Sequence, residues 1–106
     1  MKIPLSDFKG TTYVTPEEIS HMESCEGYTL IYLINKDMYK QSGNLGQYCA
    51  MVAPSGLFMR VSRFIVVNIN RVIRIEKSNH IVLHCGTELA IASENKIPLH
   101  QAILAL

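Results

Sequence analysis

The chain has 106 residues, of which 48% are hydrophobic and 18% are charged. This composition is typical of one globular domain with a modest core, and it excludes intrinsic disorder. No apolar run reaches the ~18 residues that a membrane-spanning helix needs. The first residues also lack the apolar stretch of a signal peptide. We therefore expect a single cytoplasmic domain over residues 1–106 that makes no contact with a membrane.

The charge is nearly balanced in total but uneven along the chain. Ten basic and nine acidic residues give a net charge of +1, which alone argues against nucleic-acid binding because that function usually requires a basic surplus. However, all the arginines fall within one short stretch, namely Arg60, Arg63, Arg71 and Arg74. The distribution therefore leaves a nucleic-acid partner open.

The cysteines and histidines predict no metal and no cofactor. Cys25, Cys49 and Cys85 lie far apart without a CxxC pair, so we interpret them as small buried hydrophobic residues. His80 and His84 fall on one predicted strand, where four residues span ~13 Å, too far for two ligands of one ion. His21 lies near Glu23, but no serine or cysteine nucleophile accompanies the pair, so no enzyme is predicted.

Short strands are predicted through the first forty residues. Their expected ranges are 3–5, 11–14, 19–24, 28–34 and 38–41. A threonine, a proline and two glutamates at residues 15–18 predict a helical turn before the third strand. Both faces of the strand at 28–34 are apolar, which predicts a central position covered on two sides.

One internal helix is predicted over residues 44–53. Its apolar side chains recur at helical spacing, at Leu45, Tyr48, Cys49 and Val52. Either Ser42 or Asn44 can cap it, and the sequence Pro-Ser-Gly at residues 54–56 ends it.

The second half of the chain continues with strands and closes with a helix. An apolar stretch at 58–67 is followed by predicted strands at 72–76, 80–85 and 88–91. A helix is predicted from Pro98 to Leu106, with residues 93–97 as its entry loop. The expected fold is mainly β, with short antiparallel strands in small sheets, one internal helix and a C-terminal helix. The predicted elements do not alternate as βαβ units, which argues against a doubly wound nucleotide-binding fold.

Several segments together resemble LytTR DNA-binding domains. Residues 58–68, FMRVSRFIVVN, resemble the family pattern F-x-R-V/C-H-R-S-Y-x-V-N, and residues 69–75 follow as the apolar strand. Residues 18–28, the Asn44-Leu45 pair and residues 83–93 resemble further family segments in the same order. The resemblance covers Tyr13 to Leu106.

The resemblance implies a mainly β fold that reads double-stranded promoter DNA from loops placed in successive major grooves. Family contacts correspond here to Gly27-Tyr28, to residues 60–63 and to residues 93–96. The implied function is sequence-specific DNA binding for bacterial transcription regulation. Such domains occur alone or as the output domain of two-component response regulators, so a receiver domain, a sensor partner and a homodimer on repeated half-sites are implied as well.

The chain departs from the family pattern at its DNA-contacting positions. Ser62 replaces the common histidine, Phe64-Ile65 replaces Ser-Tyr, and residues 94–96 (Glu-Asn-Lys) stand where arginines are usual. A carboxylate repels phosphates, although a glutamate can accept a hydrogen bond from cytosine. These changes support an alternative hypothesis: a LytTR-like protein-interaction module with weak or lost DNA affinity.

The two arginines of this segment have competing interpretations. Arg63 is the candidate for reading a base, because its guanidinium can bind guanine O6 and N7 together; the alternative is a surface side chain lying over Phe64. Arg60 is expected either to contact phosphate or to form an ion pair, for which Glu23 is the nearest candidate partner.

The remaining candidate DNA contacts are Ser62, Tyr28, Asn95 and Lys96. Tyr28 could stack on DNA or serve as a plain strand residue. Asn95 and Lys96 precede a predicted helix N-terminus, where backbone N–H groups can bind phosphate, or they only cap and solvate it. Asn68 is expected to be structural, satisfying backbone groups at a turn.

Overall fold

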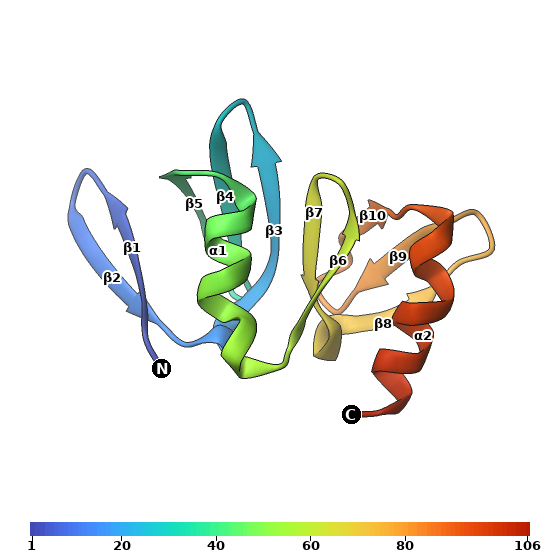
Figure 1. Cartoon of the computed structure of the whole chain (residues 1–106). Helices are drawn as coiled ribbons and strands as arrows, with labels where there is room; N and C mark the ends of the chain where they lie inside the picture. Colours follow the sequence, from blue (N-terminus) through green and yellow to red (C-terminus); the bar gives the residue numbers. More distant parts are fainter.

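Ten short strands form three antiparallel sheets in the computed structural model, which describes residues 1–106 (Figure 1). The strands are β1 (Ile3–Asp7), β2 (Gly10–Val14), β3 (Ile19–Cys25), β4 (Tyr28–Leu33), β5 (Met38–Ser42), β6 (Phe58–Ser62), β7 (Ile65–Asn68), β8 (Val72–Ile75), β9 (His80–Leu83) and β10 (Glu88–Ala90). The sheets have the orders β1-β2, β5-β4-β3-β7-β6 and β10-β9-β8. The mainly β class, with small antiparallel sheets, is confirmed.

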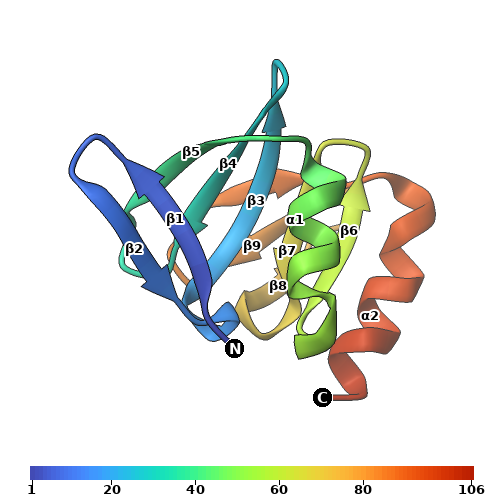
Figure 2. The ribbon, with the colours of Figure 1, turned by 60° about the vertical axis from the view of Figure 1, so that its left-hand side comes forward.

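The two α-helices are α1 (Leu45–Val52) and α2 (Lys96–Leu104). Asn44 caps α1 because its side chain accepts a hydrogen bond from the Gln47 backbone N–H at 2.9 Å, while the Gln47 side chain accepts from the Asn44 backbone N–H at 3.0 Å. Figure 2 shows α1 standing between the β1–β2 hairpin and β6. Neither helix has the length and apolar character needed to cross a membrane.

Two hydrophobic cores lie side by side and share the β6–β7 hairpin. Alternate residues of β7 face different cores, because successive side chains of a strand point to opposite faces. Val66 belongs to the first core, with the β1–β2 hairpin and α1, whereas Val67 belongs to the second, with the β10-β9-β8 sheet and α2. The β6–β7 hairpin is therefore fixed from both sides.

The most central strand is β3 and not β4. The five-stranded sheet places β3 between β4 and β7, and its first four residues are all buried. In β4 one face is buried and the other is only half-covered, so the expectation of burial on two sides is met in part. The sequence did not predict that β3 is buried, because the polar Ser20 and His21 interrupt its apolar pattern.

The C-terminal segment differs in its boundaries from the sequence prediction. The helix begins at Lys96, two residues before Pro98, which still lies in the first turn. Residues Ser93–Asn95 form a short 3-10 helix where a loop was expected. Strand β9 ends at Leu83 because Leu83 then accepts the turn hydrogen bond from the Gly86 N–H at 2.8 Å.

Asn68 has a structural role at the end of β7. Its side chain is buried, donates from Nδ2 to the Ile19 carbonyl at 3.0 Å and accepts from the Asn70 N–H at 3.0 Å. It therefore ties the start of β3 to a short 3-10 helix at Ile69–Arg71.

We expect Asn68→Ala to lower the free energy of unfolding by about 2 kcal/mol, because two hydrogen bonds are lost and the buried Ile19 carbonyl loses a donor. Urea denaturation of the purified chain measures this. The exposed Asn70→Ala is the control, since it keeps the backbone N–H. Equal stabilities of the two variants would contradict the role assigned to Asn68.

Candidate nucleic-acid interface

Three turns line one edge of the molecule, the upper edge in Figure 1. They are the β3–β4 turn at residues 26–27, the β6–β7 turn at residues 63–64, and the segment that leads from β10 into α2. Hydrogen bonds connect the three. The Ser24 backbone N–H donates to the Phe64 carbonyl at 2.9 Å, and the Ala92 N–H donates to the Val61 carbonyl at 2.9 Å. The segments that sequence analysis singled out are therefore brought together.

The tip of the β6–β7 hairpin presents Arg63 and Phe64 to solvent. Ser62 pairs with Ile65, so these two residues form the whole turn. The Ser62 hydroxyl accepts a hydrogen bond from the Phe64 N–H at 3.3 Å, which fixes the turn and makes Ser62 a structural support of the tip. The Arg63 guanidinium lies 5.5 Å from the centre of the Phe64 ring. The expected contact between arginine and ring is present, and both side chains remain exposed.

A β-bulge in β6 explains how the third segment is held. Arg60 pairs with Val66 and Ser62 with Ile65, which leaves Val61 as the extra residue of the bulge. Its carbonyl accepts from the Ala92 N–H and also from Asn95 Nδ2, each at 2.9 Å. The Asn95 amide group is thus engaged inside the protein, so the structure gives this residue a positioning role.

Lys96 and Glu94 place opposite charges near the start of α2. Lys96 is the first residue of the helix, and its Nζ donates to the Lys77 carbonyl at 3.3 Å. Glu94 is exposed in the preceding 3-10 helix. A short turn of chain therefore carries one cation and one carboxylate at the far end of the edge.

Tyr28 lies at the opposite end of this edge, at the start of β4. It is exposed, and the Lys40 Nζ lies 4.4 Å from the centre of its ring. The preceding residues Glu26 and Gly27 both have positive φ angles, 48° and 86°, as a tight two-residue hairpin turn requires. Tyr28 therefore projects beside a rigid turn together with a lysine from β5.

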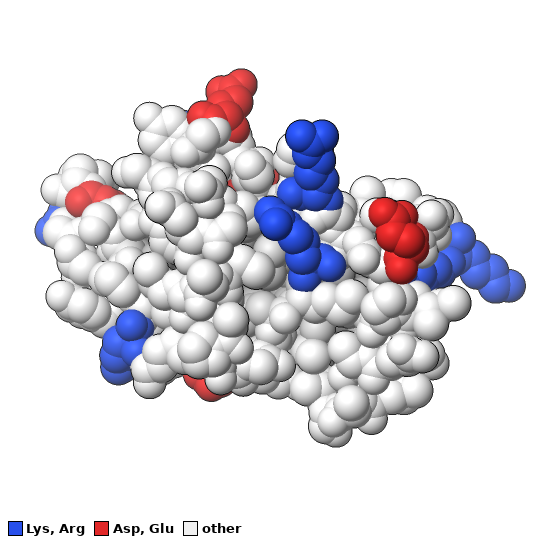
Figure 3. All heavy atoms as spheres, viewed as in Figure 1, with Lys and Arg blue, Asp and Glu red and all other residues white.

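The charges along this edge are mixed. Figure 3 shows basic side chains standing at the top of the β6–β7 hairpin, with acidic groups on either side. The basic residues of that hairpin are Arg60 and Arg63, both exposed. The proposed ion pair between Arg60 and Glu23 is not formed, since the one ion pair of the structure joins Arg74 to Glu76 at 3.6 Å. Arg60 is therefore available to an outside anion.

Two exposed residues of this edge were not among the sequence candidates. Lys40 reaches Tyr28 across the β4–β5 pair, in which Leu30 is opposite Lys40 and Tyr28 is opposite Ser42. That register could have been found from the hairpin turn. The sequence identified Phe64 as a departure from the family and as a ring that Arg63 could cover, but not as a contact residue, and 56% of its surface is exposed at the tip of a turn. The tip therefore presents an exposed aromatic ring beside an arginine.

Asn95→Ala is expected to loosen the segment from Ala92 to Lys96, because the Val61 carbonyl loses one of its two donors. The measurable result is faster amide hydrogen exchange over these residues, with a loss of about 1 kcal/mol in local stability. Glu94→Ala, at the neighbouring exposed position, is the control. Unchanged exchange in the Asn95 variant would show that its side-chain contact does not hold the segment.

The structure is a small, mainly β domain that presents arginine, lysine and aromatic side chains on turns along one edge. The family model for the LytTr DNA-binding domain matches residues 9–103. The chain therefore belongs to the LytTR family, whose members are DNA-binding domains of transcription regulation and are not defined by an enzymatic activity.

Structural comparison gives the same fold. A LytTr DNA-binding domain from Bacillus cereus, described as part of a methyl-accepting/DNA response regulator, superposes with a TM-score of 0.77. The similarity covers 99% of this chain and 97% of the other, at 16% sequence identity. No sequence among curated proteins is significantly similar to this chain.

Proposed function

We propose that this chain binds double-stranded promoter DNA in the bacterial cytoplasm in a sequence-specific manner, with the three turns of its upper edge facing the major groove. The observation that carries the proposal is Arg63. It lies exposed at the tip of a two-residue turn, and hydrogen bonds on both sides of that turn fix it against the neighbouring segments. A rigidly held arginine at a projecting tip is suited to bind a guanine edge.

The residues of the edge divide by the contacts they can make. Arg63 reads a base, and Arg60, Lys40 and Lys96 contact phosphates. Tyr28 packs against the DNA backbone beside Lys40, which already lies over its ring. Phosphate contacts of this kind position a protein on the duplex, whereas the contact to a base edge gives specificity.

Hydrogen bonds from Ser24 to Phe64 and from Ala92 to Val61 hold the three turns as one continuous edge. This edge faces successive major grooves on one side of the duplex. We further propose that two copies occupy repeated half-sites as a homodimer, and that a receiver domain or a sensor protein supplies the signal.

A second candidate function is protein interaction, supported by the carboxylates of the edge. Glu26 lies in the β3–β4 turn and Glu94 in the segment before α2, and both are exposed. Each would repel phosphates at one end of the proposed interface. A partner with basic groups opposite these carboxylates would be favoured instead.

Selection from a pool of random duplexes separates the two functions. The proposal predicts an enriched sequence that contains a guanine essential for binding and that recurs at about one helical turn. Arg74→Ala is the matched control, because Arg74 is an exposed arginine on β8, outside the three turns of the proposed edge. That variant should enrich the same sequence. If no duplex sequence is enriched at low salt, the result would favour the protein-interaction function.

A further inference from the structure

A polar cavity lies between the five-stranded sheet and the β10-β9-β8 sheet, away from the proposed DNA edge. It has a volume of about 130 Å³ and is lined by Ser20, Ile34, Lys36, Arg71, His84 and Cys85. An adjoining hollow shares three of these residues and adds His21, Tyr32, Leu33 and Thr87. We call the first space the Arg71 cavity.

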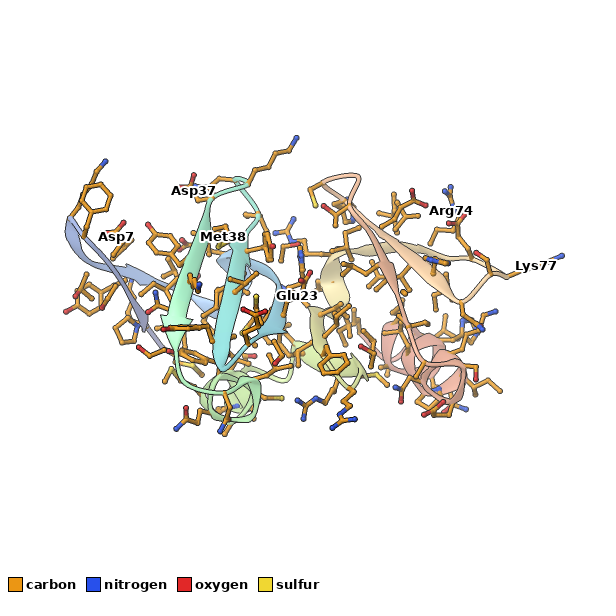
Figure 4. All side chains as sticks on the ribbon, turned by 90° about the horizontal axis from the view of Figure 1, so that it is seen from above. Asp7, Glu23, Asp37, Met38, Arg74 and Lys77 are labelled. Atoms are coloured by element: carbon orange, nitrogen blue, oxygen red, sulfur yellow. The ribbon has the colours of Figure 1, made fainter.

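The Arg71 cavity lies at the far end of the β3–β4 hairpin from the DNA edge. Ile19 pairs with Leu33 at one end of this hairpin, and Cys25 pairs with Tyr28 at the other. Ser20 is therefore about 17 Å along the strand from the edge, at 3.3 Å per residue. Figure 4 places Asp37, in the turn that follows Lys36, on the side of the molecule away from both helices. The cavity is thus a separate site.

The charged groups of the cavity are all positive or neutral. Lys36 and Arg71 line it, no aspartate or glutamate does, and neither cation has an ion-pair partner. On its other side Arg71 borders a hollow that includes Glu17, but no ion pair joins these two residues. The cavity therefore has an uncompensated positive charge.

Arg71 also carries an unsatisfied buried donor. Its Nε is the one buried side-chain nitrogen or oxygen of the structure that has no hydrogen-bond partner. Leaving such a donor unpaired is unfavourable, and more so when the group is charged. Nε itself has almost no accessible surface, so an ion in the cavity would be bound by the terminal guanidinium nitrogens of Arg71, which are accessible and have no partner within the chain.

Hydroxyl and thiol groups complete the wall. Cys85 Sγ lies 3.1 Å from the Thr87 hydroxyl, and the Ser20 hydroxyl lies 3.0 Å from His21 Nδ1. Burial would raise the pKa of the Cys85 thiol, but hydrogen bonds to Thr87 and Ser20 outweigh burial and lower it. These groups complete the wall with polar side chains and add no carboxylate to it.

We propose that the Arg71 cavity binds a small oxoanion, the phosphate or carboxylate group of a small molecule, held by the Arg71 guanidinium and the Lys36 ammonium group. Arginine is suited to this task because its planar donors match the oxygens of both groups. The volume exceeds the ~30 Å³ share of a single water molecule, so an ion of phosphate size fits. Such a ligand links the β4–β5 turn to Arg71 and Cys85, which belong to separate parts of the fold.

Nuclear magnetic resonance titration of the whole chain, without DNA, tests this proposal. The probes are inorganic phosphate and acetate, each at constant ionic strength maintained with chloride. The Arg71 Nε–Hε signal is expected to shift and saturate with at least one probe, together with the backbone amides of Ser20 and Cys85. The probe that binds more tightly identifies the phosphate or the carboxylate as the preferred group.

Variants distinguish a built site from general attraction of ions. Lys36→Gln and Arg71→Gln should each weaken binding about tenfold or more, whereas Arg74→Gln should bind like the unchanged chain. If Arg71→Gln does not fold, Lys36→Gln in the exposed turn still decides the question.

Two results would overturn the proposal. An Arg71 Nε–Hε signal that moves with neither probe would mean that no oxoanion binds beside this guanidinium. Equal affinities of the Lys36 and Arg74 variants would mean an adventitious ion only. Both results leave DNA binding untouched, since the titration contains no DNA.

Discussion

Arg63→Ala is expected to reduce affinity for the preferred duplex by about 10- to 100-fold, because one bidentate contact to guanine contributes about 1–3 kcal/mol of discrimination. The loss should be much smaller on duplexes of unrelated sequence, where the arginine has no matching base. Fluorescence anisotropy with a labelled duplex measures both affinities. Arg74→Ala, which changes an exposed arginine outside the three turns, should leave them unchanged.

Chemical change of the DNA makes this prediction specific to the base contact. Replacing the essential guanine by 7-deazaguanine removes one of the two acceptors that Arg63 would bind. The unchanged protein should then lose affinity, while the Arg63→Ala variant should lose little more. Independent, additive losses from the two changes would show that Arg63 does not contact that base.

Acid is expected to destabilise the chain through His21. This side chain is buried, its ring stacks on Tyr32 at 4.4 Å between centroids, and burial lowers its pKa from 6.5 to about 4. Between these values the unfolded chain binds a proton that the folded chain does not. Stability is therefore lost as the pH falls through this range, by about 2 kcal/mol between about pH 7 and pH 5.

His21→Phe tests this assignment because it keeps an aromatic ring against Tyr32 but removes the titrating group. Urea denaturation at the two pH values should show that the variant loses much less stability on acidification than the unchanged chain. His100→Gln, an exposed position on α2, is the control and should keep the full loss. An identical acid loss in the His21 variant would assign the effect to other groups.

Local signals predicted much of the fold because they act within a few residues. The helix over residues 44–53 follows from an apolar stripe and from the Asn44 cap, and the structure has both. The structural role of Asn68 also follows from its place at a turn. Boundaries were less accurate near Lys96, because the preceding 3-10 helix has no side-chain cap that marks its start.

The candidate site was predicted in its segments but not in its internal connections. The family resemblance pointed to Arg60 and Arg63, yet nothing local shows that the Val61 carbonyl would accept from Asn95, 34 residues away. That contact depends on a bulge, which is a property of strand pairing. The unpaired Arg71 Nε has the same origin, since only the packing of two sheets shows that it is buried.

The most direct test of the proposed function is fluorescence anisotropy of the chain with its selected duplex at about 50 mM and about 200 mM salt. Three phosphate contacts predict a log–log slope of about −3, at about −0.9 per contact. We expect tight binding with this slope, and weaker binding by Arg63→Ala on the selected sequence alone. Absence of binding to any duplex at low salt, or an equal loss by Arg63→Ala on every sequence, would contradict it.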